Sequence, residues 1–350
     1  MFTEDTVRTI REQSPLMERT GTITPSLLEV IYAHQLFKLF VPTALGGRMG
    51  SLPEALQWCE QASWADGSFG WLVTIGSGGG YFTPRMRPET ARKLFTPREA
   101  VIAGSGFPSG VARREGGGYS VSGQWKYCSG ATHATMFTAN AMIDDNTMRS
   151  FILMPDQVRI VEDWQAFGLR ATASHSIVVE NAWVPEEMTF ELNDVYDDYD
   201  DILYHYPFLP FAETSFAAVA IGIGRHFLEE ARSVFLANKE AWKTSHPERY
   251  AFVLGKLDEW EPRLLQEVER FYDRVNQSWE RHVRQGNVEE QEWLQVGQQS
   301  KVAANTALQA AQSIFPYMGI HAVMEQSAIN RIYRDLHTAC QHTMLVPFFD

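Results

Sequence analysis

Residues 253–279 read VLGKLDEWEPRLLQEVERFYDRVNQSW. Apolar side chains recur in this stretch at intervals of three or four positions, at Val253, Leu257, Trp260, Leu264, Val268, Phe271, Val275 and Trp279. Such spacing keeps one face of a helix apolar along its whole length, which is typical of the seam of a helical bundle. The Ala-rich stretch 300–315 predicts a second helix that packs closely against its neighbours. We therefore expect residues 208–345 to be helical.

Upstream of this region the periodicity changes to that of strands. Short runs rich in Val, Ile, Phe and Tyr are separated by Gly, Asp-Asn and Pro-Asp turns, at residues 101–104, 119–123, 136–142, 150–154 and 176–184. Several short strands at this spacing favour a small barrel or sandwich.

The N-terminal part, residues 1–95, again shows helical spacing. Residues 26–40 place an apolar stripe before the helix-breaking Pro42, and residues 53–65 repeat the pattern. The glycine-rich tract 76–80 is predicted either to interrupt a helix or to let a ligand approach the backbone. The fold class is therefore α+β, with three predicted domains at residues 1–98, 99–190 and 202–350.

The charge balance bears on the choice of partner. The 350 residues carry 30 Lys and Arg against 43 Asp and Glu, a net charge of −13. Eight of the acids lie in residues 185–201, which we interpret as a solvated connector. A general nucleic-acid binder needs a basic face to displace counterions from phosphates, so no nucleic-acid partner is expected.

Cysteine usage and hydropathy indicate the compartment. Cys59, Cys128 and Cys340 lie far apart and form no CxxC pair, which argues against a disulfide framework and a zinc site. No stretch approaches the 18 apolar residues of a membrane span. Residues 1–21 have no apolar core of the kind that secretory signals contain. We expect a cytoplasmic protein that is not bound to a membrane.

Searches for common catalytic motifs exclude several chemistries. Gly222-Ile-Gly224 lacks the third glycine of GxGxxG and lies in an Ala-rich helical run, so a Rossmann dinucleotide site is not expected. The phosphate-binding P-loop and the GxSxG nucleophile elbow are absent from the sequence. His337 and His342 are five positions apart, whereas a shared metal on a helix prefers four, so no metal site is predicted.

Three strings, in this order along the chain, carry a resemblance to a known family. They are GQWKYCSG at residues 123–130, WQAFGLRATASH at 164–175 and RIYRDLHTACQH at 331–342. Together they resemble the acyl-CoA dehydrogenase superfamily, and most of all its flavin-dependent monooxygenase branch, which includes aromatic and steroid-phenol hydroxylases and dibenzothiophene monooxygenase. The resemblance extends from about residue 15 to 345. It implies an N-terminal helical domain, a middle β-barrel and a C-terminal four-helix bundle.

The resemblance also implies a flavin site. By position, Tyr127 matches the aromatic residue beside the isoalloxazine ring, and Ser129 matches the hydroxyl donor near flavin N5, with Cys128 between them. Trp71 and the turn that contains Gly106 and Phe107 match other positions of the flavin pocket. The alternative interpretation of residues 127–129 is an ordinary barrel strand.

The departures from the family pattern decide between two chemistries. Acyl-CoA dehydrogenases carry a catalytic Glu nine residues after the Arg of an Arg-Asp pair, where it abstracts a proton. Counting from Arg334, this position is Thr343, which cannot act as a base. Glu213 lies near the alternative Glu position of some members. The monooxygenase branch has a His eight residues after the Arg, and here that residue is His342, a candidate general acid or base.

The choice between FMN and FAD depends on segments of the family that this sequence lacks. The segments that hold the ADP half of FAD in the family have no counterpart here, so FMN is favoured over FAD. The resemblance implies a separate flavin reductase, a homotetramer and a small aromatic or heterocyclic substrate. Two alternatives remain open: an acyl-CoA dehydrogenase-like FAD enzyme that desaturates an acyl thioester, and a non-catalytic member that acts as a binding subunit.

Overall fold

The computed structural model describes residues 1–144 and 147–346, in which helices, strands and helices follow one another along the chain. The N-terminal helices are α1 (Glu4–Thr20), α2 (Pro25–Ala33), α3 (Leu52–Ala65), α4 (Gly67–Gly78) and α5 (Pro88–Phe95). The helix predicted for residues 26–40 is shorter than expected. It ends at Ala33 because Gln35 takes a left-handed conformation with φ of 52°, and only a single 3-10 turn, Leu36–Lys38, follows.

Side-chain caps determine where two of these helices begin. Ser51 and Glu54 form a reciprocal capping box at the start of α3. Asp66 caps α4 by accepting a hydrogen bond from the Phe69 amide at 2.9 Å. The glycine tract 76–80 continues from α4 into a 3-10 turn, Gly79–Arg85. A Cβ at Gly76 would lie 2.4 Å from the Phe37 ring, so this glycine serves helix packing.

The middle part of the chain forms one seven-stranded sheet. Its strands are β1 (Ile102–Glu115), β2 (Gly118–Cys128), β3 (Met136–Ile143), β4 (Met148–Leu153), β5 (Arg159–Val161), β6 (His175–Pro185) and β7 (Thr189–Phe190). They lie in the order β5-β6-β2-β1-β3-β4-β7, and β1 and β3 pair in parallel. Each of the five predicted strands is present, and each is longer than expected. Closure of this sheet into a barrel stays a prediction.

The C-terminal part returns to helices α6 (Phe208–Ala237), α7 (Lys239–Ser245), α8 (Pro247–Gln285), α9 (Glu290–Ile314) and α10 (Ala328–Ala339). The predicted seam is confirmed: seven of its eight members on α8 are buried, and Trp279 is partly buried. Gly222 and Gly224 lie inside α6, where a Cβ would come within 2.3 Å of the Glu60 carbonyl and 2.6 Å of Ala307. Both glycines lie in a helix, as their sequence context predicted, and the structure shows that they serve close helix packing.

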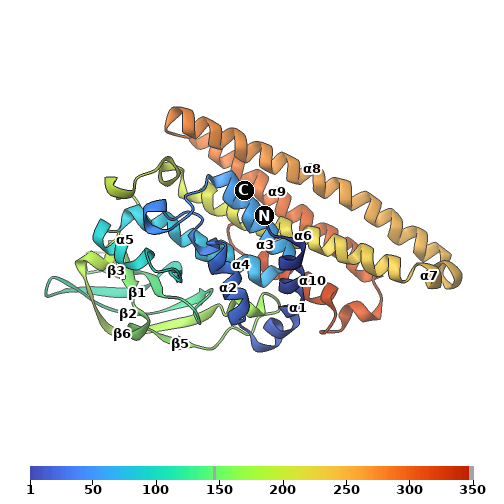
Figure 1. The fold of residues 1–350 in the computed structure, drawn as a ribbon, viewed down its shortest axis with the longest axis horizontal. Coiled ribbons are helices and arrows are strands. Elements are labelled where there is room, and N and C mark those ends of the chain that lie inside the picture. Colours follow the sequence, from blue (N-terminus) through green and yellow to red (C-terminus); the bar gives the residue numbers. More distant parts are fainter. Residues whose placement is uncertain (145–146, 347–350) are drawn as a thin grey trace.

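The arrangement of these parts leaves the candidate residues at a junction. Figure 1 shows α8 and α9 along one side of the molecule, α3, α4 and α6 in the middle and the sheet on the opposite side. The N-terminal helices and the bundle share one hydrophobic core, whereas the interior of the sheet forms a separate cluster. Among the described residues, no helix is long and apolar enough to cross a membrane.

Candidate active site

Four side chains from separate segments meet where the sheet adjoins the helices. Trp71 on α4 donates a hydrogen bond from Nε1 to Ser129 Oγ at 2.9 Å, just after β2. The Trp71 ring also lies 5.8 Å, edge to face, from His342, which follows α10. Phe216 on α6 stacks on His342 with ring centroids 3.8 Å apart and lies 5.3 Å from Trp71. The structure therefore brings three predicted site residues together and adds Phe216.

The position of Ser129 follows from a bulge at the end of β2. Trp125 pairs with Ile177 and Cys128 with His175, so the register shifts between these pairs. Tyr127 takes the left-handed conformation there, with φ of 64°, and its side chain is 70% exposed. Cys128 is buried, and burial raises the pKa of its thiol to about 12. The bulge thus separates an outward ring from the inward Ser129, which is 6% exposed.

The hydroxyl groups of Ser129, Ser174 and Thr172 form a hydrogen-bonded chain, which we call the hydroxyl file, that extends from Ser129 into the protein. Ser129 Oγ lies 2.7 Å from Ser174 Oγ, which in turn lies 2.7 Å from Thr172 Oγ1. Thr172 donates to the Leu169 carbonyl at 2.8 Å. Ser174 and Thr172 belong to the second sequence string, but the string alone gave them no role.

His342 is a neutral imidazole at pH 7. Burial against its aromatic neighbours lowers the pKa of His342 to about 4, because the charged form loses hydration. The Met344 amide donates to Nδ1 at 3.3 Å, so the neutral ring carries its hydrogen on Nε2. In this tautomer the free edge of His342 is a hydrogen-bond donor.

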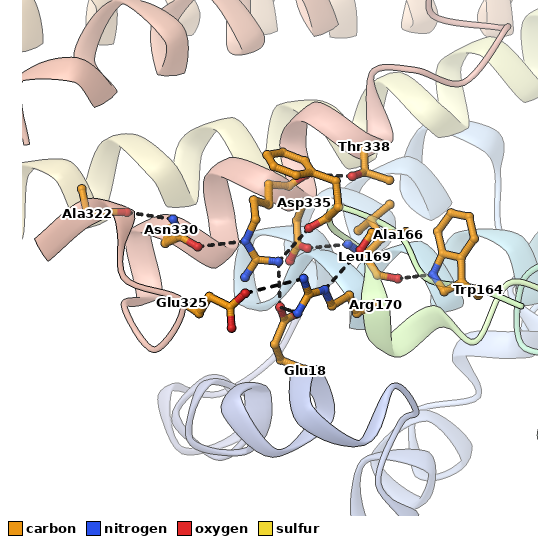
Figure 2. Close-up of polar contacts among 12 residues, drawn as sticks. Glu18, Trp164, Ala166, Leu169, Arg170, Ala322, Glu325, Asn330, Asp335 and Thr338 are labelled. Atoms are coloured by element: carbon orange, nitrogen blue, oxygen red, sulfur yellow. Dashed lines mark hydrogen bonds and ion pairs between the residues drawn. The ribbon is translucent and has the colours of Figure 1, made fainter. Parts of the chain in front are cut away.

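The third string holds the second string in place. Arg334 donates to the Phe167 carbonyl at 2.8 Å and pairs with Glu18 of α1 at 2.7 Å. Asp335 accepts a hydrogen bond from the Leu169 amide at 2.6 Å, and Figure 2 shows Asp335 beside Leu169. Burial, and then the nearby charge of Asp66, raises the pKa of Asp335 to about 8. Burial therefore favours the protonated form of this carboxyl group.

The remaining predicted flavin residues lie on exposed backbone. Phe107 on β1 is 73% exposed, and the Gly106 carbonyl accepts from Asn140 Nδ2 at 2.9 Å. Ser109 donates to the Gln124 carbonyl at 2.7 Å, which places this part of β1 beside β2. Trp164 lies edge-on to Tyr127, with ring centroids 6.2 Å apart.

Glu213, the alternative base, forms an ion pair with Lys301 inside the helical bundle. Its side chain on α6 is buried and accepts a hydrogen bond from Lys301 of α9 at 2.7 Å. A Cβ at Gly297 would come within 2.1 Å of the Glu213 carboxylate, so this glycine makes room for the ion pair. The arrangement is that of a structural link between two bundle helices.

The residues at the junction have the chemistry that a flavin ring requires. A flavin ring needs a planar apolar surface and a polar group at N5. At the junction the rings of Trp71 and Phe216 supply apolar surface and the Ser129 hydroxyl supplies the polar group. Tyr127 and Phe107 present exposed rings on β2 and β1. In the described ranges, no group of three or more His, Cys, Asp or Glu side chains is placed to hold a metal ion.

Comparison with known proteins supports the resemblance found in the sequence. Residues 214–347 match the family "Acyl-CoA dehydrogenase, C-terminal domain". An indole-3-acetate monooxygenase from Pseudomonas putida is 28% identical over 347 residues, which cover 96% of this chain and 88% of that protein. The oxygenase subunit of a flavin-dependent monooxygenase from Rhodococcus jostii is 26% identical over 51% of this chain and 48% of its own length.

A solved structure has the same fold. The dibenzothiophene monooxygenase of Paenibacillus sp. A11-2, in complex with FMN and indole, superimposes with a TM-score of 0.76 at 21% identity. The match covers 98% of this chain and 92% of that one. The resemblance inferred from the three strings is confirmed.

Proposed function

We propose that this chain, as a member of the acyl-CoA dehydrogenase superfamily that is most like its flavin-dependent monooxygenase branch, is an oxygenase that uses reduced flavin and O2 on a small aromatic substrate. The observation that carries the proposal is the junction of Trp71, Ser129 and His342. It combines a polar anchor for a flavin with a neutral imidazole, while Thr343 occupies the position of the dehydrogenase base.

The proposed roles follow from the contacts. Tyr127 and Phe107 would support the flavin ring, together with the backbone of Gly106 and Cys128, and Ser129 would bind the edge that contains N5. Bound reduced flavin supplies the electrons that activate O2. Trp71 and Phe216 close the inner side of the site with apolar surface, and this excludes water from the reacting atoms.

His342 would act on the substrate or the reacting oxygen. Its Nε2–H is a donor, since Nδ1 is occupied by the Met344 amide. Because its pKa is about 4, the ring donates this hydrogen bond as a neutral group throughout the physiological range. Stacking on Phe216 fixes the plane of the ring, and therefore the direction of the bond.

The finer assignments rest on the sequence and on the named relatives. FMN is favoured because the segments that hold the ADP half of FAD are missing, and the Paenibacillus enzyme was solved with FMN. A separate reductase is proposed because the Rhodococcus relative is named an oxygenase subunit. Indole-3-acetate is the first substrate to test. The three domains, barrel closure, a cytoplasmic location and a homotetramer are further parts of the proposal.

An anaerobic titration followed by one addition separates the alternatives. We expect the purified protein to bind reduced FMN with a micromolar or lower Kd. We also expect that octanoyl-CoA, added without oxygen to protein loaded with oxidised flavin, leaves the flavin absorbance unchanged. Bleaching by the acyl-CoA would contradict the oxygenase proposal and support desaturation with Glu213 as base. Failure to bind FMN or FAD in either redox state would support a non-catalytic binding subunit.

A further inference from the structure

The hydroxyl file below Ser129 has two ends whose hydrogen-bonding roles are fixed. At one end the indole N–H of Trp71 only donates, and it donates to Ser129. At the other end the carbonyl of Leu169 only accepts, and it accepts from Thr172. Between them Ser129, Ser174 and Thr172 lie at successive distances of 2.7 Å. All three hydroxyl groups are buried, so water does not compete for their hydrogens.

The two ends determine the direction of every bond between them. Each hydroxyl group has a single hydrogen. Because Thr172 uses its hydrogen on Leu169, Ser174 must donate to Thr172, and Ser129 must donate to Ser174. The hydrogen of Ser129 therefore points into the protein. Its oxygen already accepts from Trp71 and keeps one lone pair for a ligand.

We infer that Thr172 and Ser174 are positioning residues that make Ser129 a hydrogen-bond acceptor, so that the site prefers a flavin whose N5 carries a hydrogen. Reduced flavin has an N–H group at N5, whereas oxidised flavin has only a lone pair there. This inference rests on the proposed function and deepens it. It also reverses the expectation from the sequence that Ser129 donates to N5.

The opposite direction of the file has a definite cost. For Ser129 to donate to a ligand, Ser174 would have to donate to Ser129 and Thr172 to Ser174. The Leu169 carbonyl would then lose its bond from Thr172 and keep those from Trp164 Nε1, at 3.0 Å, and the Thr172 amide, at 3.2 Å. The net loss is one neutral hydrogen bond, which corresponds to about fivefold in an equilibrium constant.

The test is the ratio of the Kd for oxidised FMN to the Kd for reduced FMN, measured by anaerobic titration without substrate. Thr172→Val removes the hydroxyl group that fixes the direction, and it keeps the backbone bond from the Gly130 amide to the Thr172 carbonyl, at 2.8 Å. We expect this variant to lower the ratio about fivefold. Thr172→Ser retains the hydroxyl group and should keep the wild-type ratio.

Two more variants make the result decisive. Thr189→Val is the matched control, because Thr189 is also a buried threonine that donates to a carbonyl three residues earlier, Glu186, at 2.9 Å. It should leave the ratio unchanged. Ser174→Ala interrupts the file at another point and should lower the ratio as Thr172→Val does, so it decides the matter if Thr172→Val fails to fold.

The outcomes distinguish the inference from the proposed function. An unchanged ratio in Thr172→Val and Ser174→Ala, with both redox states bound, would overturn the inference and leave the flavin site in place. An equal fall of the ratio in the Thr189→Val control would also overturn it. Absence of binding to either redox state in the wild-type protein would instead contradict the proposed function itself.

Discussion

At the scale of single residues, His342 shows how packing sets chemistry. Its ring stacks on Phe216 and lies edge to face with Trp71, and this burial lowers its pKa from 6.5 to about 4. A neutral imidazole donates one hydrogen bond and accepts one, and the Met344 amide takes the accepting nitrogen. The proposed role of His342 therefore requires no change of its charge between pH 5.5 and 8.

Replacement of His342 tests that role. We expect His342→Ala to bind reduced FMN within about threefold of wild type but to form product about 100-fold more slowly, the lower range for loss of one hydrogen-bond donor to a reacting oxygen. Electrons should then appear as hydrogen peroxide, measured against product by a coupled assay. The neighbouring exposed Thr343→Ala is the control and should behave as wild type. Normal product yield in His342→Ala would show that the role is wrong.

At the scale of elements, α10 holds in place the loop that leads into the site. Arg334 and Asp335 hold the loop at residues 167–169, and the backbone approaches closely there, since a Cβ at Gly168 would lie 2.2 Å from the Arg334 carbonyl. This loop leads directly into Thr172 and Ser174, and α10 leads into His342. The contact between α10 and this loop therefore positions both the hydroxyl file and the imidazole of His342.

The buried carboxyl group of Asp335 makes the stability of the protein depend measurably on pH. Its folded pKa of about 8 lies above the usual 3.8, so between these values the folded state holds a proton that the unfolded state has lost. The free energy of unfolding therefore decreases with rising pH in that window, by up to about 1.4 kcal/mol per unit. Asp335→Asn mimics the protonated form and lacks this slope.

We accordingly expect the stability of Asp335→Asn, relative to wild type, to increase from pH 5 to pH 8 in denaturant titrations. Asp335→Ala leaves the Leu169 amide without its acceptor, so it should lose about 1–3 kcal/mol at pH 6, where Asp335→Asn loses less. A constant stability difference between Asp335→Asn and wild type over this pH range would contradict the assignment of a buried protonated carboxyl group.

At the scale of the whole molecule, the sequence predicted the parts better than their junction. The helix of residues 253–279 and the five strands follow from local periodicity, so they were accessible without a structure. Trp71, Ser129 and His342 were accessible only through the resemblance, because they lie far apart in the chain. Phe216 was missed, since a buried Phe on an apolar helix carries no signal of its own.

The direction of the hydroxyl file was inaccessible for a physical reason. Hydrogen-bond direction depends on which groups stand at the two ends, here the Trp71 indole and the Leu169 carbonyl. These residues come from different elements, and only the bulge after Trp125 brings Ser129 to the end of the file. The short strings show which polar residues are present, and the fold determines what each of them donates to.

The most direct test of the central claim is a single turnover under ¹⁸O2. Wild-type protein loaded anaerobically with reduced FMN is mixed with indole-3-acetate and ¹⁸O2, and the product is analysed by mass spectrometry. The account predicts one ¹⁸O atom in the product, and it predicts that Ser129→Ala and His342→Ala shift the yield toward labelled hydrogen peroxide. A product oxidised without incorporation of ¹⁸O would contradict it.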